Sequence, residues 1–131
     1  MDFLDKLKQA IDAEYEAAIF YGQLKKATKD PLYQEFIEHA REDEKKHFQL
    51  FQQLYHKLTG SYYENKKNKK EFKTFQEGIE MALKDELEAG ELYRDMLFEM
   101  PTNDAYYPLF VAMTDEMEHA TRFAAIYGSL K

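Results

Sequence analysis

Apolar residues recur along four long stretches of the chain at spacings of three and four, which is the period of an amphipathic α-helix. The stretches span about residues 2–27, 30–60, 74–100 and 103–127. Glycine and proline, which interrupt helices, number only five and three in the whole chain. The pattern therefore predicts an all-α protein of four helices.

Residue types that favour helix ends flank these stretches. Asp30 is a good N-cap, and Pro31 after it fits the first position of a helix. The sequence Thr74 to Glu77 has the form of a capping box. Gly60 and Gly128 follow the second and fourth stretches, where a glycine is typical of a helix end.

The connection between the second and third helices is too long for a tight turn. It covers about residues 60–73 and is rich in lysine, which we interpret as a solvated connection. Eleven extended residues reach ~36 Å, close to the ~37 Å length of a 25-residue helix. We therefore predict one domain, residues 1–131, in which hairpins at about 2–59 and 74–128 are joined by a crossover that returns along the bundle.

The two predicted hairpins resemble each other at an offset of 72 residues, without a gap. The identical pairs are Ala10/Ala82, Glu14/Glu86, Ala17/Ala89, Tyr21/Tyr93, Ala40/Ala112, Asp43-Glu44/Asp115-Glu116, His47/His119, Phe51/Phe123 and Tyr55/Tyr127. We interpret this repeat as a duplicated helical hairpin.

Ionisable residues interrupt the apolar stripe of every predicted helix. The segment "DEKKH" places Glu44 and His47 on a stripe that also holds Ile37 and Phe51, whereas Asp43 has the character of a solvent-facing residue. The repeat contains "DEMEH" at residues 115–119. The ionisable stripe residues are Glu14, Glu44, His47, Glu86, Glu116 and His119.

Four carboxylates in one core are costly unless something neutralises them, because they repel each other and lose their hydration. No lysine or arginine shares the stripes near them. Two divalent cations would balance the four negative charges. The i, i+3 spacing of Glu and His points both side chains at one ion. Oxygen-rich ligation with imidazole suits iron or manganese, and zinc can enter such sites. We therefore predict a two-metal centre.

Composition excludes several other classes of protein. The net charge of −7 argues against nucleic-acid binding, which needs a basic surface. The absence of cysteine excludes disulfides and thiolate metal sites. No apolar run reaches the ~18 residues of a membrane span. The N-terminal segment lacks the pattern of a signal peptide, so we expect a cytoplasmic location.

The sequence resembles the ferritin-like di-iron carboxylate superfamily, and most closely its rubrerythrin-type branch, over essentially the whole chain. "EYEAAIFY" with "DEKKH" is similar to the first hairpin of that family, and "ELEAGELY" with "DEMEH" to the second. The resemblance implies a ferritin-like four-helix bundle and two iron ions. It assigns Glu44 and Glu116 as bridging ligands, Glu14 and Glu86 as terminal ligands, and His47 and His119 as the nitrogen ligand of one iron each.

The resemblance also gives Tyr21 and Tyr93 a catalytic place beside the metals, with hydrogen bonds to ligand carboxylates; core packing is the alternative. Two departures matter. The chain has no cysteine-ligated rubredoxin domain, so electrons must come from an external donor protein. Ala89 stands where rubrerythrins usually carry a further glutamate, which makes the site more symmetric and leaves peroxidase turnover an open question.

The leading hypothesis is a non-haem di-iron oxidoreductase that reacts with hydrogen peroxide or dioxygen, as a peroxidase or ferroxidase in oxidative stress or iron handling. A manganese-containing, catalase-like variant uses similar ligands. The alternatives are an iron-binding, storage or delivery protein without redox turnover, and a metal-free bundle that acts as an interaction module. We expect a homodimer, although the sequence does not indicate which surface would form it.

Overall fold

The computed structural model describes residues 2–131, and over that range it is helical, with no β-strand. The helices are α1 (Phe3–Lys26), α2 (Pro31–Thr59), α3 (Phe75–Phe98) and α4 (Tyr106–Ser129), with a short 3-10 turn, η1 (Asn103–Ala105), before α4. The prediction of an all-α protein with four helices is confirmed. None of these helices has an apolar stretch long enough to cross a lipid bilayer.

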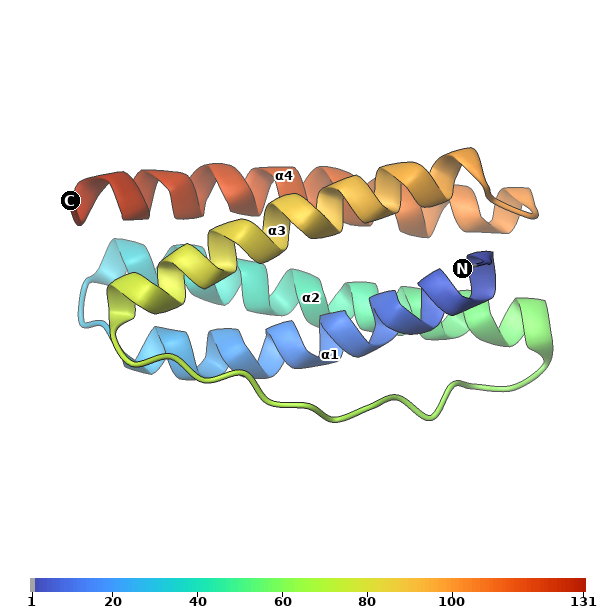
Figure 1. Cartoon of the computed structure of the whole chain (residues 1–131), viewed down its shortest axis with the longest axis horizontal. Helices are drawn as coiled ribbons and strands as arrows, with labels where there is room; N and C mark the ends of the chain where they lie inside the picture. The colour runs from blue at the N-terminus through green and yellow to red at the C-terminus, as the bar shows by residue number, and fades with distance from the viewer. Residues whose placement is uncertain (1) are drawn as a thin grey trace.

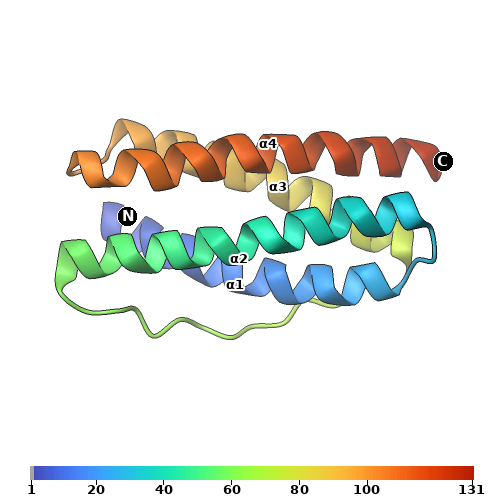
Figure 2. The ribbon, with the colours of Figure 1, turned by 180° about the vertical axis from the view of Figure 1, so that it is seen from behind.

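The four helices lie alongside one another as two antiparallel pairs (Figure 1). Helix α1 packs most extensively against α2, and α3 against α4. The pairs meet through smaller contacts of α2 with α4 and of α1 with α3, and Figure 2 shows α2 and α4 running side by side on the back of the molecule. The α1–α3 contact is the smallest of the four, which leaves room between these two helices.

The helix ends follow their capping residues. The Asp30 carboxylate accepts hydrogen bonds from the backbone N–H groups of Leu32 and Tyr33 at the start of α2. The Thr74 hydroxyl accepts from the N–H of Glu77. Gly60 ends α2 with a φ of +85°, a conformation that glycine adopts without strain.

The fourth helix departs from the expected bounds at both ends. It begins at Tyr106 instead of about residue 103, because Pro108 in its first turn has no N–H for a bond back to Asp104, and a 3-10 turn precedes it. Gly128 does not stop the helix, which continues to Ser129. The side chain of Leu130 packs on the core beyond it, which holds the last turn helical.

The apolar core consists of two clusters near opposite ends of the bundle. Leu7, Ile11 and Phe51 belong to one cluster, and Leu24 and Ile37 to the other. Each of these side chains is fully buried, and burial of such a residue contributes about 1.5–3 kcal/mol. On every helix the ionisable stripe residues lie between the two clusters, so the clusters position the polar middle and offset its cost.

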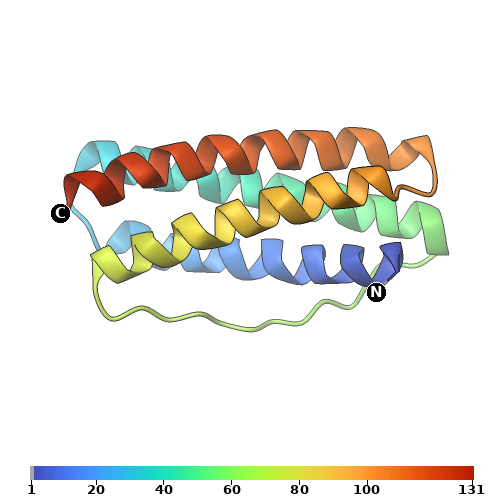
Figure 3. The same ribbon diagram turned by 45° about the horizontal axis from the view of Figure 1, so that its top comes forward.

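The crossover runs along the whole bundle from the end of α2 to the start of α3, on the side of α1 (Figures 1 and 3). It is fastened at several points. The backbone N–H and C=O of Tyr63 form hydrogen bonds with the side-chain amide of Gln52. The Tyr63 hydroxyl donates a hydrogen bond of 3.0 Å to Oδ2 of Asp12. The N–H of Lys66 also donates to Asp12. The solvated connection predicted from its lysines is therefore exposed but held in place along α1.

Candidate metal centre

The structure brings together all six predicted metal ligands in the middle of the bundle. Each helix contributes one glutamate, and α2 and α4 each add one histidine. All six side chains are almost completely buried, with 0–2% of their surface exposed. They are Glu14, Glu44, His47, Glu86, Glu116 and His119.

The six residues form two overlapping groups of four, and each group can place its ligand atoms within 4.8 Å of one another. One group is Glu14, Glu44, His47 and Glu116, and the other is Glu44, Glu86, Glu116 and His119. Each group holds one histidine and three glutamates, and two of those glutamates are shared. Each group could therefore ligate a cation, and the two positions would be neighbours.

The shared glutamates face both histidines. Oε1 of Glu44 lies 3.1 Å from Nδ1 of His47 and 3.7 Å from Nδ1 of His119. Oε1 of Glu116 lies 3.4 Å from each of the same two nitrogens. Both Oε1 atoms are buried and have no hydrogen-bond partner. Because buried polar atoms in folded proteins normally have a partner, these oxygens fit a pair of cations between the helices.

The outer glutamates each approach one histidine. Oε2 of Glu14 lies 3.3 Å from Nδ1 of His47, and Oε2 of Glu86 lies 3.1 Å from Nδ1 of His119. The two halves of the site therefore have matching geometry, in the same register as the sequence repeat.

Two buried tyrosines hold the outer glutamates from the opposite hairpin. The Tyr93 hydroxyl donates a hydrogen bond of 2.8 Å to Oε1 of Glu14, and the Tyr21 hydroxyl donates to Oε1 of Glu86. Burial, together with the charge of the glutamate that each one contacts, raises the pKa of both tyrosines well above its ordinary value. Each tyrosine is therefore a protonated donor, while its catalytic role stays a prediction.

Two aspartates complete the centre, and sequence reasoning missed them. Nε2 of His47 lies 2.8 Å from Oδ2 of Asp115, and Nε2 of His119 lies 2.7 Å from Oδ2 of Asp43. Asp43 is thus a partner of a buried histidine, and the interpretation of it as solvent-facing is wrong. Each aspartate reaches across from the helix that faces its histidine. The sequence feature that could have indicated these aspartates is that Asp43 and Asp115 occupy the same position in the two repeats.

The aspartates fix how each imidazole can act. A histidine that gives one ring nitrogen to a carboxylate presents the other toward a metal in a defined orientation. Here Nε2 of each histidine is engaged by an aspartate and Nδ1 faces the glutamates. The hydrogen bond from His119 and its charge outweigh the effect of burial and lower the pKa of Asp43, so this carboxylate stays ionised.

Without cations the centre holds protons instead. Burial and the charges of neighbouring glutamates raise the pKa of Glu44 and of Glu116 well above the ordinary value. Burial acts to lower the pKa of His47, but the Glu14 charge and the bond with Asp115 raise it to about 12. For His119, contacts with Asp43 and Glu86 likewise overcome burial and raise the pKa to about 10. Metal binding must therefore displace protons from these side chains.

A cavity of about 350 Å³ opens between α1 and α3 and reaches the centre. Glu14, Glu44, Glu86 and Glu116 line its inner end, and Ala89 is part of its wall. The absence of a larger side chain at residue 89 therefore leaves free space beside the carboxylates.

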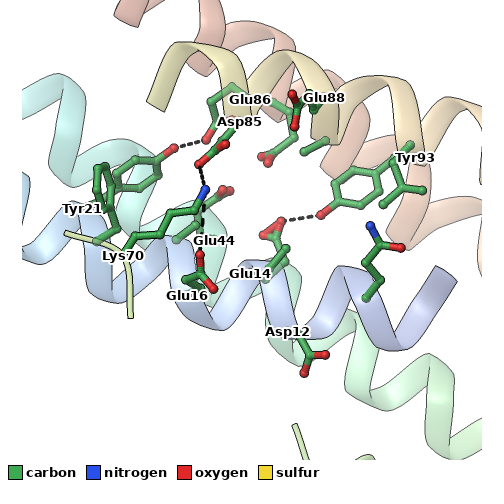
Figure 4. A pocket seen from close by; sticks show the side chains of 17 residues that line it. Asp12, Glu14, Glu16, Tyr21, Glu44, Lys70, Asp85, Glu86, Glu88 and Tyr93 are labelled. Carbon is green, nitrogen blue, oxygen red and sulfur yellow. Dashed lines mark hydrogen bonds and ion pairs between the residues drawn. The ribbon is translucent and has the colours of Figure 1, made fainter. Parts of the chain in front are cut away.

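The outer part of this cavity is acidic and is crossed by one lysine (Figure 4). Asp12, Glu16, Asp85 and Glu88 line it. Nζ of Lys70, from the crossover, lies 2.5 Å from Asp85 on α3 and 3.9 Å from Glu16 on α1. The lysine thus bridges the two helices that border the opening.

The other two histidines lie outside the six-ligand centre, and both are exposed. Nε2 of His39 is 3.2 Å from Oδ2 of Asp43, the same oxygen that contacts His119. His56 stacks on Tyr62 near the end of α2.

Fold and site together define a class: a four-helix bundle with a buried, acid- and histidine-lined centre. No family model matches the sequence. The chain is 30% identical over 117 residues to the uncharacterized protein YhjR of Bacillus subtilis (strain 168). The matched region covers 89% of this chain and 81% of YhjR. The chain belongs to the same family as YhjR.

Solved structures share the fold. A hypothetical protein from Pyrococcus furiosus superposes with a TM-score of 0.85 at 24% identity, covering 98% of this chain and 89% of that one. A conserved hypothetical protein from Mycobacterium tuberculosis gives a TM-score of 0.81 at 15% identity, with coverages of 95% and 89%. At these identities the similarity is one of fold alone.

Proposed function

We propose that this protein is a ferritin-like di-iron oxidoreductase that reduces hydrogen peroxide or dioxygen. One observation carries the proposal: two buried glutamate oxygens, from Glu44 and Glu116, have no hydrogen-bond partner and stand between two histidine nitrogens. The two antiparallel hairpins and the long crossover support the ferritin-like assignment.

The ligand roles follow from the shared and unshared carboxylates. Glu44 and Glu116 would help to hold both ions because they belong to both groups of candidate ligands. Glu14 with His47, and Glu86 with His119, would complete one ion each. Iron bound there supplies two electrons, one from each ion, which with two protons reduce one hydrogen peroxide to two water molecules. Manganese or zinc would fit the same donor atoms.

The protein's own contribution is positioning and shielding. Tyr21 and Tyr93 hold the outer glutamates by hydrogen bonds, and Asp43 and Asp115 orient the histidines. The cavity between α1 and α3 has the size and position to admit a small oxidant to the inner carboxylates. The apolar clusters at both ends of the centre keep bulk water away.

Repeated turnover needs a reductant from outside the chain. The sequence contains no cysteine and therefore no thiolate-bound redox centre of its own. We propose that a separate electron-transfer protein returns two electrons to the centre after each oxidation.

The experiment is a single-turnover comparison of the two oxidants. Protein loaded anaerobically with Fe(II) is mixed with one equivalent of hydrogen peroxide or of dioxygen, followed by near-ultraviolet absorption, and then reduced chemically and mixed again. We expect faster oxidation by peroxide, iron retained in the protein, and an equal second cycle. Oxidation no faster than that of free Fe(II), or a Glu44→Ala variant that reacts like the unmodified protein, would contradict the proposal.

A second candidate is an iron-binding or delivery protein without redox turnover. The acidic outer cavity, with Asp12, Glu16, Asp85 and Glu88, favours it because such a surface attracts cations. The same experiment separates the two functions. Faster oxidation by dioxygen, with iron leaving the centre and no second cycle, would support iron handling instead of an oxidoreductase.

A further inference from the structure

The outer surface of the second hairpin carries large apolar side chains in contact with solvent. We refer to this surface as the α3/α4 outer face. Its residues, with the exposed fraction of each, are Leu87 (52%), Phe98 (81%), Tyr106 (51%), Tyr107 (64%), Phe110 (42%) and Met117 (57%). Large aromatic residues and methionine are enriched in the centres of protein interfaces.

The apolar residues of this face recur along one side of each helix, with the exposed residues Glu91 and Arg94 between Leu87 and Phe98 on α3. On α4, Tyr106, Phe110 and Met117 follow at spacings of four and seven, which keeps them on one side of the helix. On α3, Leu87 and Phe98 are three turns apart on one side. Met117 of α4 lies beside Gly90 of α3, because a Cβ at residue 90 would be in ordinary contact with Cγ of Met117 at 3.9 Å. The two helices lie side by side along their lengths (Figure 3).

The first hairpin provides an internal control, because it has the same helix pairing without the apolar face. At the repeat offset of 72, Leu87 corresponds to Tyr15 and Tyr107 to Glu35, while the other four correspond as follows: Phe98 to Lys26, Tyr106 to Gln34, Phe110 to Glu38 and Met117 to Lys45. On the α1/α2 surface these four positions are charged or polar. Two of them form ion pairs: Glu38 with Lys25 and Arg41, and Lys45 with Glu42. Pairing of two helices in this fold therefore does not require apolar residues there, and the α3/α4 outer face needs another explanation.

We propose that the α3/α4 outer face binds the same face of a second copy of this chain, in a symmetric dimer about a two-fold axis. In such a dimer the α3/α4 outer faces of the two chains contact each other, and the charged α1/α2 surface stays in solvent. Two chains of net charge −7 repel each other, so a contact is least unfavourable where few acidic residues lie. Glu91, four residues after Leu87, is an acidic residue of this face that is unpaired within residues 2–131. The charged residues Arg94 and Asp95 pair with each other within α3.

The available area suits a stable dimer. A 24-residue helix is ~36 Å long, and two neighbouring helices present a surface ~20 Å wide. The face therefore offers ~700 Å² per chain, close to the ~800 Å² per partner of a standard interface. This inference does not depend on the metal centre, so its test and that of the proposed function are separate.

The first test replaces two residues of the face with their counterparts from the first hairpin. Sedimentation equilibrium is measured for the unmodified chain and for the double variant Phe110→Glu with Met117→Lys. Leu32→Glu is the matched control, because Leu32 is equally exposed but lies at the start of α2. Circular dichroism and cooperative thermal unfolding check that each variant is folded.

We expect the unmodified chain and the control to have twice the chain mass of 15.6 kDa, and the double variant to be a folded monomer. Loss of two central contacts should weaken dimerisation at least ~30-fold. A monomeric unmodified chain, or a dimer that survives both substitutions, would overturn the proposal and leave the face to a different protein.

A second test does not depend on the double variant folding. Because the chain has no cysteine, Phe110→Cys introduces a single thiol into the face, and Leu32→Cys a single thiol outside it. A short bis-maleimide should cross-link the first variant into a dimer and leave the second monomeric. Equal cross-linking of the two variants would contradict the proposed face.

Discussion

At the residue scale, the centre includes an aspartate that contacts each histidine, in addition to the six candidate ligands. Asp115 fixes His47 and Asp43 fixes His119, both through Nε2. The aspartates are only partly buried, whereas the histidines are fully buried. Each aspartate therefore connects a buried histidine to the surface.

Replacement of either aspartate by asparagine should weaken metal binding without unfolding the protein. Asp115→Asn removes the charge that favours Nε2–H and releases the ring of His47 from its orientation, so we expect affinity for one ion to fall about 10–100-fold. Asp43→Asn should do the same for the ion beside His119. Isothermal titration with Co(II) measures both constants. Glu42→Gln, an exposed change on the same helix, is the control, and an equal effect there would refute the positioning role.

At the scale of elements, the close approach of helix and crossover depends on one glycine. A Cβ at Gly78 would lie 2.5 Å from Cδ1 of Leu24 and 3.1 Å from Cγ of Phe72. Leu24 is fully buried and cannot swing aside. Gly22, four residues before the end of α1, has no such neighbour, because the nearest atom to its Cβ position is Nε of Arg41 at 3.6 Å.

Substitution of these two glycines by alanine should change the free energy of unfolding in opposite directions. Gly78→Ala should lower the free energy of unfolding by about 1–3 kcal/mol, since the new methyl group overpacks the site. Gly22→Ala should raise it by about 0.5–1 kcal/mol, since alanine loses less conformational freedom in a helix. Urea denaturation of the metal-free protein measures both. A stabilising Gly78→Ala would show that this contact is looser than described.

The crossover places Lys70 at the mouth of the cavity that leads to the centre. Its positive charge lies between Asp85 and Glu16 at the mouth of the cavity, where it opposes the entry of cations. Lys70→Ala should speed Co(II) uptake several-fold in stopped-flow absorption, with unchanged stoichiometry. Lys67→Ala, elsewhere in the exposed crossover, should have no effect. Equal or slower uptake by the Lys70 variant would exclude this function for the lysine.

The helices and the meeting of the six candidate ligands in the core could be predicted from sequence because both follow local periodicity. Glu44 and His47 stand at core spacing on one helix, and their repeat partners stand at the same spacing on another. Asp43 could not be assigned in this way, since its contact with His119 depends on how α2 faces α4. The position of Lys70 depends on the path of an aperiodic connection, which no periodicity encodes.

At the scale of the whole molecule, stability and metal binding are linked through protons. The pKa of Glu44, Glu116, His47 and His119 is raised in the folded, metal-free protein. A raised pKa contributes stability that is complete below the pKa of the unfolded chain and is lost as pH rises through the folded value. For the histidines that window runs from 6.5 to about 10 and 12.

The metal-free protein should therefore lose stability as pH rises above about 5, while metal ions bind more tightly because fewer protons compete. We expect the increase in Tm on adding Co(II) to be small near pH 5 and on the order of 10 °C near pH 8. Differential scanning calorimetry of the free and loaded protein measures the difference. A Tm increase that is constant with pH would show that these four side chains do not bind the metal.

The most direct test of the central claim is an anaerobic Fe(II) titration that counts the ions bound per chain. The account predicts two ions for the unmodified protein. It predicts the loss of both in Glu44→Ala or Glu116→Ala, because the oxygens of these residues belong to both halves of the centre. Absence of stoichiometric binding, or binding that survives both substitutions, would contradict the di-iron assignment and leave a helical bundle with a protonated acidic core.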